Sequence, residues 1–549
     1  MQIIYSGNAL FLEDLLHNRT EKIFQHSVSA RFVLKLRNLL LLALLPGATL
    51  CAQVTLPKIL ASHMVVQRDL PVHVWGMATP GEDVSVIFRG ESRTAKAGQL
   101  GRWSVYLKPG AAGGPFQMTV QGAPGAEGAP GAEAAPGTEA GNATPAQTIT
   151  LDDVLVGDVW VASGQSNMEF EMRKAATADA DLPHAANPRI RLLLIKHSAA
   201  PYAQDDIDTE GWAASSPETA KDFSAAAWYF AREIEEREKV PVGVIDSTWG
   251  GTLVESWTRL TALGENASLA QVFVSRGRMT DRESDALLED KDRQKQIEEA
   301  KAQGMPEPQF PWHPQLAMWA PGLLWNGMIA PLTPFPIRGV IWYQGESNSV
   351  IERSPTLYYP LFRTLIEDWR RQWGEGDFPF LYVQIANFKS VPIEDWAAIR
   401  EGQLKTLELR NTAMAVTIDI GNPDNVHPTD KLDVGLRLAR AARALSYDEA
   451  IEYSGPLFRQ ATTEYSSMRA WFDHAKGLMA KGGEITGFEV AGKDGKFFPA
   501  TARIEGATVV ATSPSVAEPV YVRYGWANSP LCKLFNGEGL PASPFTSEK

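Results

Sequence analysis

The spacing of hydrophobic positions changes twice along the chain. Between residues 54 and 121, apolar and polar residues alternate in short runs separated by Gly and Pro, which predicts a small antiparallel β-domain. From Leu151 onward, apolar runs alternate with helical stretches, a pattern typical of a parallel sheet in an α/β domain. From about Glu449 the short runs with glycine turns return. We therefore expect an N-terminal β-domain at 53–150, a central α/β domain at 151–447 and a C-terminal β-rich domain at 448–549.

The central region contains six apolar runs that we interpret as its strands: 154–162, 190–195, 240–245, 337–343, 380–385 and 413–418. Three further stretches are expected to be helices: 224–239, 357–373 and 430–446. Ser224 is suited to cap the first of these, because its hydroxyl accepts a hydrogen bond from the first turn. Residues 280–304 are dense in charge and helix formers, so we expect a solvated helix within an insertion at about 260–315.

Two segments depart from this folded pattern. In residues 1–52, basic side chains precede a leucine-rich run and then small residues up to Ala52, which is the layout of a secretory signal peptide. The leucine-rich run is too short to span a bilayer. Thirty residues precede the first of these basic residues, Arg31, so we interpret the true translation start as lying further downstream. We expect cleavage after Ala52 and export to the periplasm or the extracellular space. The second segment, 122–147, nearly repeats Ala-Pro-Gly-Ala-Glu and has little to bury, so we expect a disordered loop.

Composition narrows the possible functions. Apolar residues make up 44% of the chain and charged residues 21%, which are ordinary values for a folded globular protein. The chain carries 52 Lys and Arg against 65 Asp and Glu, and its net charge of −13 offers no polycationic surface for nucleic acid. Cys51 and Cys532 are the two cysteines, which excludes a disulfide framework and a four-thiolate zinc site.

Polar motifs follow four of the expected strands, at 163–168, 246–252, 344–348 and 419–428. The carboxyl ends of strands in open α/β sheets collect functional residues, so these motifs are candidate chemistry. A serine nucleophile needs a base for its proton and donors around the developing oxyanion, and the four loops contain both. Gly-Gln-Ser166-Asn and Gly-Glu-Ser347-Asn each offer such a serine, and spacing alone leaves both open. The nucleophile elbow Gly-x-Ser-x-Gly is absent from the sequence, which argues against the α/β-hydrolase family.

His427 is the histidine that follows a core strand in a loop ending at a helix, and Asp424 stands three residues before it. This makes His427 the candidate base and Asp424 the group that orients it. The same residues could serve two other chemistries. Asp419, Asp424, His427 and Asp430 lie within twelve residues, but zinc prefers more His or Cys ligands, and we expect no metal site. Glu346 as a glycosidase acid lacks an obvious partner carboxylate in the strand-end loops.

Several separate motifs, in this order, resemble the sialate O-acetylesterases of the SGNH-hydrolase superfamily. They are Ser-Gly-Gln-Ser-Asn-Met at 163–168, Trp-Gly-Gly-Thr at 249–252, Trp-Tyr-Gln-Gly-Glu-Ser-Asn at 342–348, Asp-Ile-Gly at 419–421 with Val-His-Pro at 426–428, and Tyr-Gly-Trp-Ala-Asn-Ser-Pro at 524–530. The similarity covers most of residues 54–545. It implies an SGNH-hydrolase-like parallel sheet flanked by helices, with β-rich domains at both ends.

The resemblance also implies roles for individual residues. Ser166 matches the nucleophile and His427 the base. The expected oxyanion hole consists of the amides of Ser166, Gly250 and Gly251 and the side chain of Gln344, with Glu346 and Asn348 as supporting residues. For the acid, Asp424 has the Asp-x-x-His spacing of the superfamily and Asp419 is the alternate, while some members manage with a Ser-His dyad.

These roles imply an exported serine esterase that removes O-acetyl groups from sialic acids through an acetyl-serine intermediate, without a cofactor. Deacetylation of xylan or another polysaccharide is the alternative, because the superfamily includes such esterases. An alternative of another class is a non-catalytic carbohydrate-binding protein on a decayed hydrolase scaffold, against which the intact Ser166 and His427 argue. The expected partner is an acetylated glycan, with no nucleic acid and no membrane span, and the sequence does not define the oligomeric state.

Overall fold

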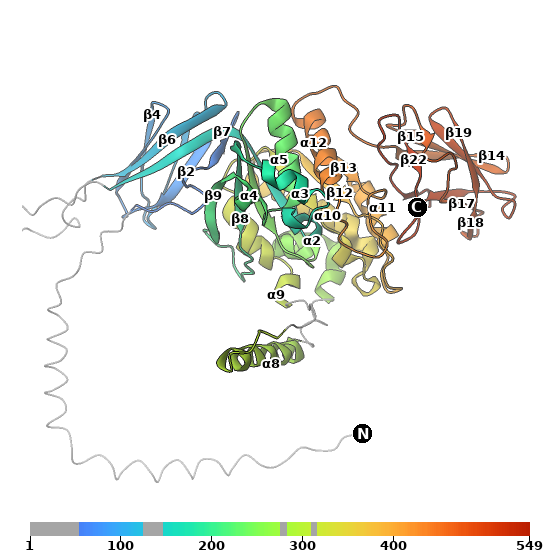
Figure 1. Cartoon of the computed structure of the whole chain (residues 1–549), viewed down its shortest axis with the longest axis horizontal. Helices are drawn as coiled ribbons and strands as arrows, with labels where there is room; N and C mark the ends of the chain where they lie inside the picture. Colours follow the sequence, from blue (N-terminus) through green and yellow to red (C-terminus); the bar gives the residue numbers. More distant parts are fainter. Residues whose placement is uncertain (1–53, 124–146, 275–282, 309–315, 549) are drawn as a thin grey trace, which may run out of the picture. The chain divides into compact units, whose positions relative to one another are not determined.

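The computed structural model describes residues 54–123, 147–274, 283–308 and 316–548 (Figure 1). The expected signal segment and nearly all of the expected loop at 122–147 lie outside the described residues. Within the described ranges, no helix combines the length and apolar character that crossing a bilayer requires.

A parallel sheet forms the centre of the molecule. Its strands lie in the order β13 (Thr412–Val416), β12 (Phe380–Gln384), β11 (Gly339–Tyr343), β7 (Thr148–Gly164), β10 (Val242–Thr248), β8 (Asn187–Ile195) and β9 (Thr209–Ser215). All neighbouring pairs are parallel except β8 with β9, which are antiparallel. Strands β10, β11, β12 and β13 are buried along their whole length, as expected when helices cover both faces of a sheet.

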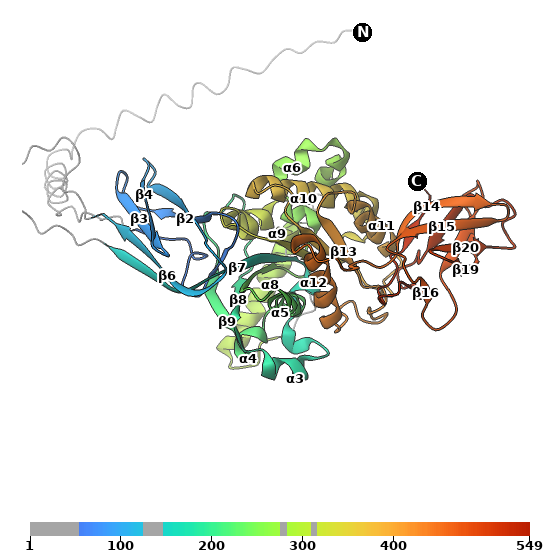
Figure 2. The same cartoon turned by 90° about the horizontal axis from the view of Figure 1, so that it is seen from above.

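Helices cover both faces of this sheet. Figure 2 shows α5 (Ala225–Glu238) and α12 (Leu432–Ser446) on one face, and α10 (Tyr358–Trp373) and α11 (Trp396–Thr406) on the other. Helix α5 begins after Ser224, whose hydroxyl accepts a hydrogen bond from the Ala227 N–H at 3.2 Å, as the sequence predicted. The charged insertion contains the expected helix, α8 (Glu283–Ala302).

The N-terminal β-strands are continuous with the central sheet through β7. The first half of β7 pairs with β6 (Gly113–Gly122), and its second half pairs with β10 and β11. Strand β1 (Val65–Gln67) also pairs with β7, while β3 (Asp83–Phe88) joins β6 to β4 (Glu91–Lys96). A separate ribbon is formed by β2 (Val72–Met77) and β5 (Arg102–Leu107). One 17-residue strand therefore crosses the boundary that the sequence suggested near residue 150.

The C-terminal residues form β-sheets around a core of their own. One sheet has the order β14 (Leu457–Glu464), β15 (Ser467–Asp473), β20 (Thr508–Thr512), β19 (Thr501–Glu505). Another has the order β18 (Phe497–Pro499), β17 (Phe488–Ala491), β21 (Tyr521–Tyr524), β23 (Phe545–Thr546), and β16 (Met479–Ala480) pairs with β22 (Leu534–Phe535). The expected α/β fold class with β-rich regions on both sides is thus confirmed.

Candidate active site

Ser166 lies directly beyond the carboxyl end of β7, at the start of the short helix α2 (Ser166–Glu169). The turn into α2 depends on Gly164, which has a φ of 133°. A Cβ at that position would lie 2.2 Å from the carbonyl oxygen of Tyr343 on β11. Only glycine permits this conformation and this close approach. Gly164 therefore specifies the turn that presents Ser166.

The side chain of Ser166 contacts His427, which lies in the loop between β13 and α12. Nε2 of His427 is 2.8 Å from Oγ of Ser166. Burial lowers the pKa of His427, and the positive charges of Lys431 and Lys174 lower it further. The ring is therefore neutral at pH 7 and able to accept the serine proton. Ser347, the competing serine, has no histidine contact within the described ranges; its N–H donates to the Gln165 side chain at 3.2 Å.

The expected acid, Asp424, does not contact the ring of His427. The Asp424 side chain is 78% exposed and pairs with Lys389 at 3.0 Å, because its loop turns outward through a bond from the Asp424 N–H to the Asn422 side chain. Asp419 forms two hydrogen bonds with the guanidinium of Arg437. No carboxylate of the described residues contacts the His427 ring. Asp424 as the orienting acid is thus wrong for this structure, and so is the alternate, Asp419.

A buried polar cluster holds the residues on either side of His427 instead. The Asn167 side chain donates to the carbonyl of Val426 at 3.0 Å, and the Lys431 ammonium donates to the carbonyl of Pro428 at 2.8 Å. Lys431 also donates to the Asn167 side-chain oxygen at 2.7 Å. Asn167 follows Ser166 directly, so the nucleophile and both neighbours of His427 belong to one hydrogen-bonded unit.

Glu346 closes this cluster from the β11 side. Its Oε1 accepts a hydrogen bond from the Asn167 side chain at 2.7 Å, while its buried Oε2 has no partner among the described residues. Burial raises the pKa of Glu346, and burial lowers the pKa of Lys431 to about 7. The two groups are close enough that the charge of each favours the charged form of the other, which opposes the effect of burial. Glu346 thus contacts the histidine loop through Asn167, and its supporting role stays a prediction.

The expected oxyanion donors fall into two groups. The side-chain amide of Gln344 is buried and donates both hydrogens, to the carbonyl of Thr252 at 3.1 Å and to the Asn348 side chain at 2.7 Å. Gln344 therefore supports the loop and has no hydrogen left to donate to an oxyanion. This corrects the expectation that its side chain belongs to the oxyanion hole. The Gly250 N–H also has a partner, the Glu169 carboxylate at 2.6 Å. The amides of Ser166 and Gly251 have no hydrogen-bond acceptor among the described residues and stay candidates.

Several residues at this site were not predicted from the sequence. Glu169, three residues after Ser166, pairs with Nε2 of His197 at 2.8 Å, and the imidazole of His197 stacks on Trp249 with ring centroids 4.4 Å apart. The regular i to i+3 spacing of a helical turn was the available signal for Glu169, whereas nothing local marked His197. A cleft of about 470 Å³ borders Glu169 and the buried Asp246, whose pKa burial raises to about 7.

Arg353 is another residue that the sequence did not predict. It donates to the carbonyl of Ser347, and its guanidinium lies over the ring of Trp319 at 4.2 Å. The Trp319 indole N–H in turn donates to the carbonyl of Gly251 at 2.8 Å, beside the candidate oxyanion amides. Arg353 has no carboxylate within ion-pair distance in the described part of the chain. No local sequence pattern indicates these contacts, because Arg353, Trp319 and Gly251 come from three separate segments.

Comparison with known proteins assigns the chain to a family. The profile of the family described as carbohydrate esterase, sialic acid-specific acetylesterase matches residues 315–444. The solved structure of a carbohydrate acetylesterase from Xanthomonas citri is 36% identical, covers 90% of this chain and 100% of its own, and superimposes with a TM-score of 0.75. The chain belongs to the sialate O-acetylesterase family of carbohydrate esterases.

More distant curated relatives agree with this assignment. The sialate O-acetylesterase of Mus musculus is 27% identical over 545 residues, which is 89% of this chain and 93% of the mouse protein. The Homo sapiens sialate O-acetylesterase is 29% identical over 433 residues, or 72% of each chain. This sialate O-acetylesterase family member is therefore a carboxylic ester hydrolase. The matched profile begins after Ser166 and includes His427. Of the two residues in the Ser166–His427 contact, the profile therefore covers the histidine.

Proposed function

We propose that the protein is a serine esterase that removes O-acetyl groups from sugars with Ser166 as nucleophile and His427 as base. The contact of 2.8 Å between Ser166 Oγ and His427 Nε2 carries the proposal, because a neutral imidazole at this distance accepts the hydroxyl proton. Asn167 and Lys431 position the histidine loop in place of an acid. The catalytic machinery is then a Ser-His dyad.

The reaction proceeds in two acyl-transfer steps. In the first step, Oγ of Ser166 attacks the acetyl carbonyl carbon while His427 takes the hydroxyl proton. The amides of Ser166 and Gly251 stabilise the oxyanion. His427 then gives the proton to the departing sugar hydroxyl, leaving acetyl-Ser166. In the second step, water attacks the acetyl carbonyl carbon while His427 takes a proton from the water. The bond from this carbon to Oγ of Ser166 then breaks, Oγ receives the proton from His427, and acetate leaves.

For the sugar we propose O-acetylated sialic acid. A sialate carboxylate requires a cation that can pair with it. Arg353 has no ion pair among the described residues and lies over Trp319, whose indole N–H donates to the carbonyl of Gly251. Lys174 and Lys389 are less suited, because each pairs with a carboxylate, Glu171 and Asp424 respectively. The description of the matched family and the names of the curated relatives also favour sialic acid.

An acetylated neutral polysaccharide such as xylan is the second candidate. The 36% identical Xanthomonas citri protein is described as a carbohydrate acetylesterase, without sialic acid. On such a substrate the guanidinium of Arg353 has no carboxylate to bind.

Acetate release from 9-O-acetylated sialic acid and from acetylated xylan, measured side by side, tests these proposals. Ser166→Ala should abolish release from the preferred substrate, while Ser347→Ala should leave it close to wild type. Arg353→Met should raise KM for the sialic acid ester at least about tenfold, since a charge-assisted hydrogen bond contributes roughly 1.5–3 kcal/mol. The same variant should leave xylan hydrolysis unchanged. An Arg353→Met enzyme with wild-type KM on sialic acid, or an active Ser166→Ala, would contradict the respective proposal.

We also propose export with cleavage after Ala52, which rests on the sequence of residues 1–52. The intact mass of the exported protein should correspond to a chain beginning at Gln53. A mass that retains Met1 would contradict this.

A further inference from the structure

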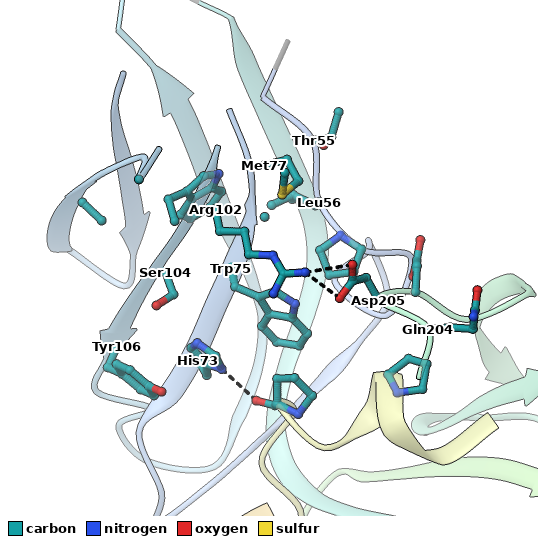
Figure 3. A pocket seen from close by; sticks show the side chains of 18 of the residues that line it. Thr55, Leu56, His73, Trp75, Met77, Arg102, Ser104, Tyr106, Gln204 and Asp205 are labelled. Carbon is teal, nitrogen blue, oxygen red and sulfur yellow. Dashed lines mark hydrogen bonds and ion pairs between the residues drawn. The ribbon is translucent and has the colours of Figure 1, made fainter. Parts of the chain in front are cut away.

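A pocket of about 820 Å³ lies away from Ser166, against the ribbon of β2 and β5 (Figure 3). The ribbon forms one wall. The loop containing Gln204 and Asp205, together with residues 330–334, forms the facing wall, and Thr55 and Leu56 lie at its side. The pocket shares no lining residue with the dyad or its buried cluster.

The outer face of this ribbon has an unusual composition. In each strand every second residue is buried, so Val72, Val74, Val105 and Leu107 form the inner face. The outward residues pair across the ribbon as His73 with Tyr106, Trp75 with Ser104 and Met77 with Arg102. Outward positions of a half-buried ribbon are usually polar. Here three of the six outward residues are aromatic rings, and all six line the pocket.

The three rings form a fixed row. The His73 ring stacks on Tyr106 with centroids 4.4 Å apart and planes 7° apart, and on Trp75 at 4.8 Å and 23°. Nδ1 of His73 donates to the carbonyl of Pro334 at 2.8 Å, which fixes the middle ring against the opposite wall. Tyr106, at the end of the row, is 59% exposed. A row of rings that is held before a ligand arrives loses little conformational entropy on binding.

The charged groups of the pocket already have partners within the protein. Both carboxylate oxygens of Asp205 accept hydrogen bonds from Arg102 at 3.0 Å across the pocket. Lys96 pairs with Asp83 at 2.9 Å. The carboxylate of Asp206 accepts hydrogen bonds from the backbone amides of Lys58 and Ile207. The pocket thus offers aromatic faces together with hydrogen-bonding groups, and it leaves no lining Lys or Arg without a carboxylate partner.

We propose that this pocket binds neutral sugar units of the glycan that carries the acetyl group, with the sugar rings packed against Tyr106 and Trp75. Sugar rings present flat faces of C–H groups to an aromatic row and hydroxyl groups to a polar rim, which is the combination found here. A pocket whose lining cations are all paired, and which carries the carboxylate of Asp206, favours an uncharged ligand over a sialate or uronate. The inference rests on the proposed function only in that the substrate is a glycan.

Binding to immobilised neutral glycans tests the pocket without requiring catalysis. The probes are chemically deacetylated xylan in one arm and desialylated mucin in the other, which separates plant-type chains from animal glycoprotein chains. Wild-type protein should be retarded by one of them, and Tyr106→Ala should weaken that binding about threefold to tenfold, the range of one aromatic contact. Tyr465→Ala is the matched control, because Tyr465 is 98% exposed and lies on the turn between β14 and β15.

Two further measurements distinguish a lost glycan contact from a folding defect or a loss of esterase activity. Trp75→Ala should weaken glycan binding as well, with an unchanged near-ultraviolet spectrum of the remaining tryptophans as evidence of folding. Hydrolysis of 4-nitrophenyl acetate should be unaffected by either pocket variant, and abolished by Ser166→Ala. Unchanged glycan binding in Tyr106→Ala and Trp75→Ala, or no retardation of the wild type by either glycan, would overturn the inference while leaving the proposed esterase intact.

Discussion

Replacing Lys431 with Met probes the buried cluster that takes the place of the acid. The lysine is fully buried and donates to the carbonyl of Pro428 at 2.8 Å and to the Asn167 side chain at 2.7 Å. Methionine keeps the linear shape of the side chain and removes both hydrogen bonds and the charge. We expect the loop of His427 to lose its fixed position.

The effect on stability should be small because two contributions oppose each other. Leaving two buried acceptors without donors costs about 2–6 kcal/mol. Burial lowers the pKa of Lys431 from 10.5 to about 7, so removing the buried ammonium recovers about 5 kcal/mol where the lysine is charged. The free energy of unfolding of Lys431→Met should therefore stay within about 3 kcal/mol of wild type.

Activity should respond far more strongly than stability. A displacement of about 1 Å in a reacting group lowers turnover roughly a hundredfold, so kcat on 4-nitrophenyl acetate should fall about tenfold to a hundredfold. The positive charge of Lys431 also lowers the pKa of His427, and its removal should shift the acid limb of the kcat/KM profile to higher pH. A purely structural role predicts no such shift.

Lys174→Met is the matched control. Lys174 also lowers the pKa of His427 but is exposed and pairs with Glu171 at 3.0 Å. Its removal should shift the same limb in the same direction while kcat stays close to wild type. If Lys431→Met retained both the kcat and the pH profile of the wild type, the positioning role of the cluster would be wrong.

Three further variants test separate parts of the site. Asp424→Ala should keep kcat/KM for acetate release within about threefold of wild type, because exposed ion pairs such as Asp424 with Lys389 contribute little. A hundredfold loss would show that Asp424 orients His427. Gly250→Ala should lower turnover at least about tenfold with normal folding, since the new Cβ would lie 3.2 Å from Cβ of Ser166 and 2.8 Å from the Glu169 carboxylate; full activity would contradict that close packing. Asp246→Asn should change how stability depends on pH. Burial raises the pKa of Asp246 to about 7, so the folded protein binds this proton more tightly than the unfolded chain, and wild-type stability falls as pH rises from about 4 to about 7. Urea unfolding should show that the free energy of unfolding falls between pH 5 and pH 8 by about 3 kcal/mol less in Asp246→Asn than in the wild type. An equal fall in both proteins would contradict the titration of a buried Asp246.

The sequence was sufficient for the parts of the fold that depend on local patterns. Fully buried parallel strands are continuous apolar runs, so β11 and β12 were predicted to within two residues at each end. Strand β9 and helix α11 were missed, because β9 is an edge strand with little apolar alternation and α11 is buried on several sides. The crossing of residue 150 by β7 was also missed, since its first half pairs with a strand of the N-terminal region and not with the parallel sheet.

The candidate site also contains residues that local patterns predict and residues that depend on distant contacts. Ser166 and His427 stand next to strand ends, so position in the sequence was enough to nominate them. The acid was wrong because the Asp-x-x-His spacing does not fix the path of an irregular loop, and here the loop turns Asp424 toward Lys389. Gln344 was assigned as a donor from resemblance, but its hydrogens are used within the loop. Lys431, His197 and Arg353 depend on contacts between distant segments, which no local pattern encodes.

The most direct test of the central claim is covalent labelling of the nucleophile by a fluorophosphonate, read by intact mass and peptide mapping. A fluorophosphonate reacts with a serine whose hydroxyl proton is taken by a neighbouring base. We predict one label per chain, on the peptide that contains Ser166, with no labelling of Ser166→Ala and strongly slowed labelling of His427→Ala. Labelling of Ser347, or undiminished labelling in His427→Ala, would contradict the Ser166–His427 dyad.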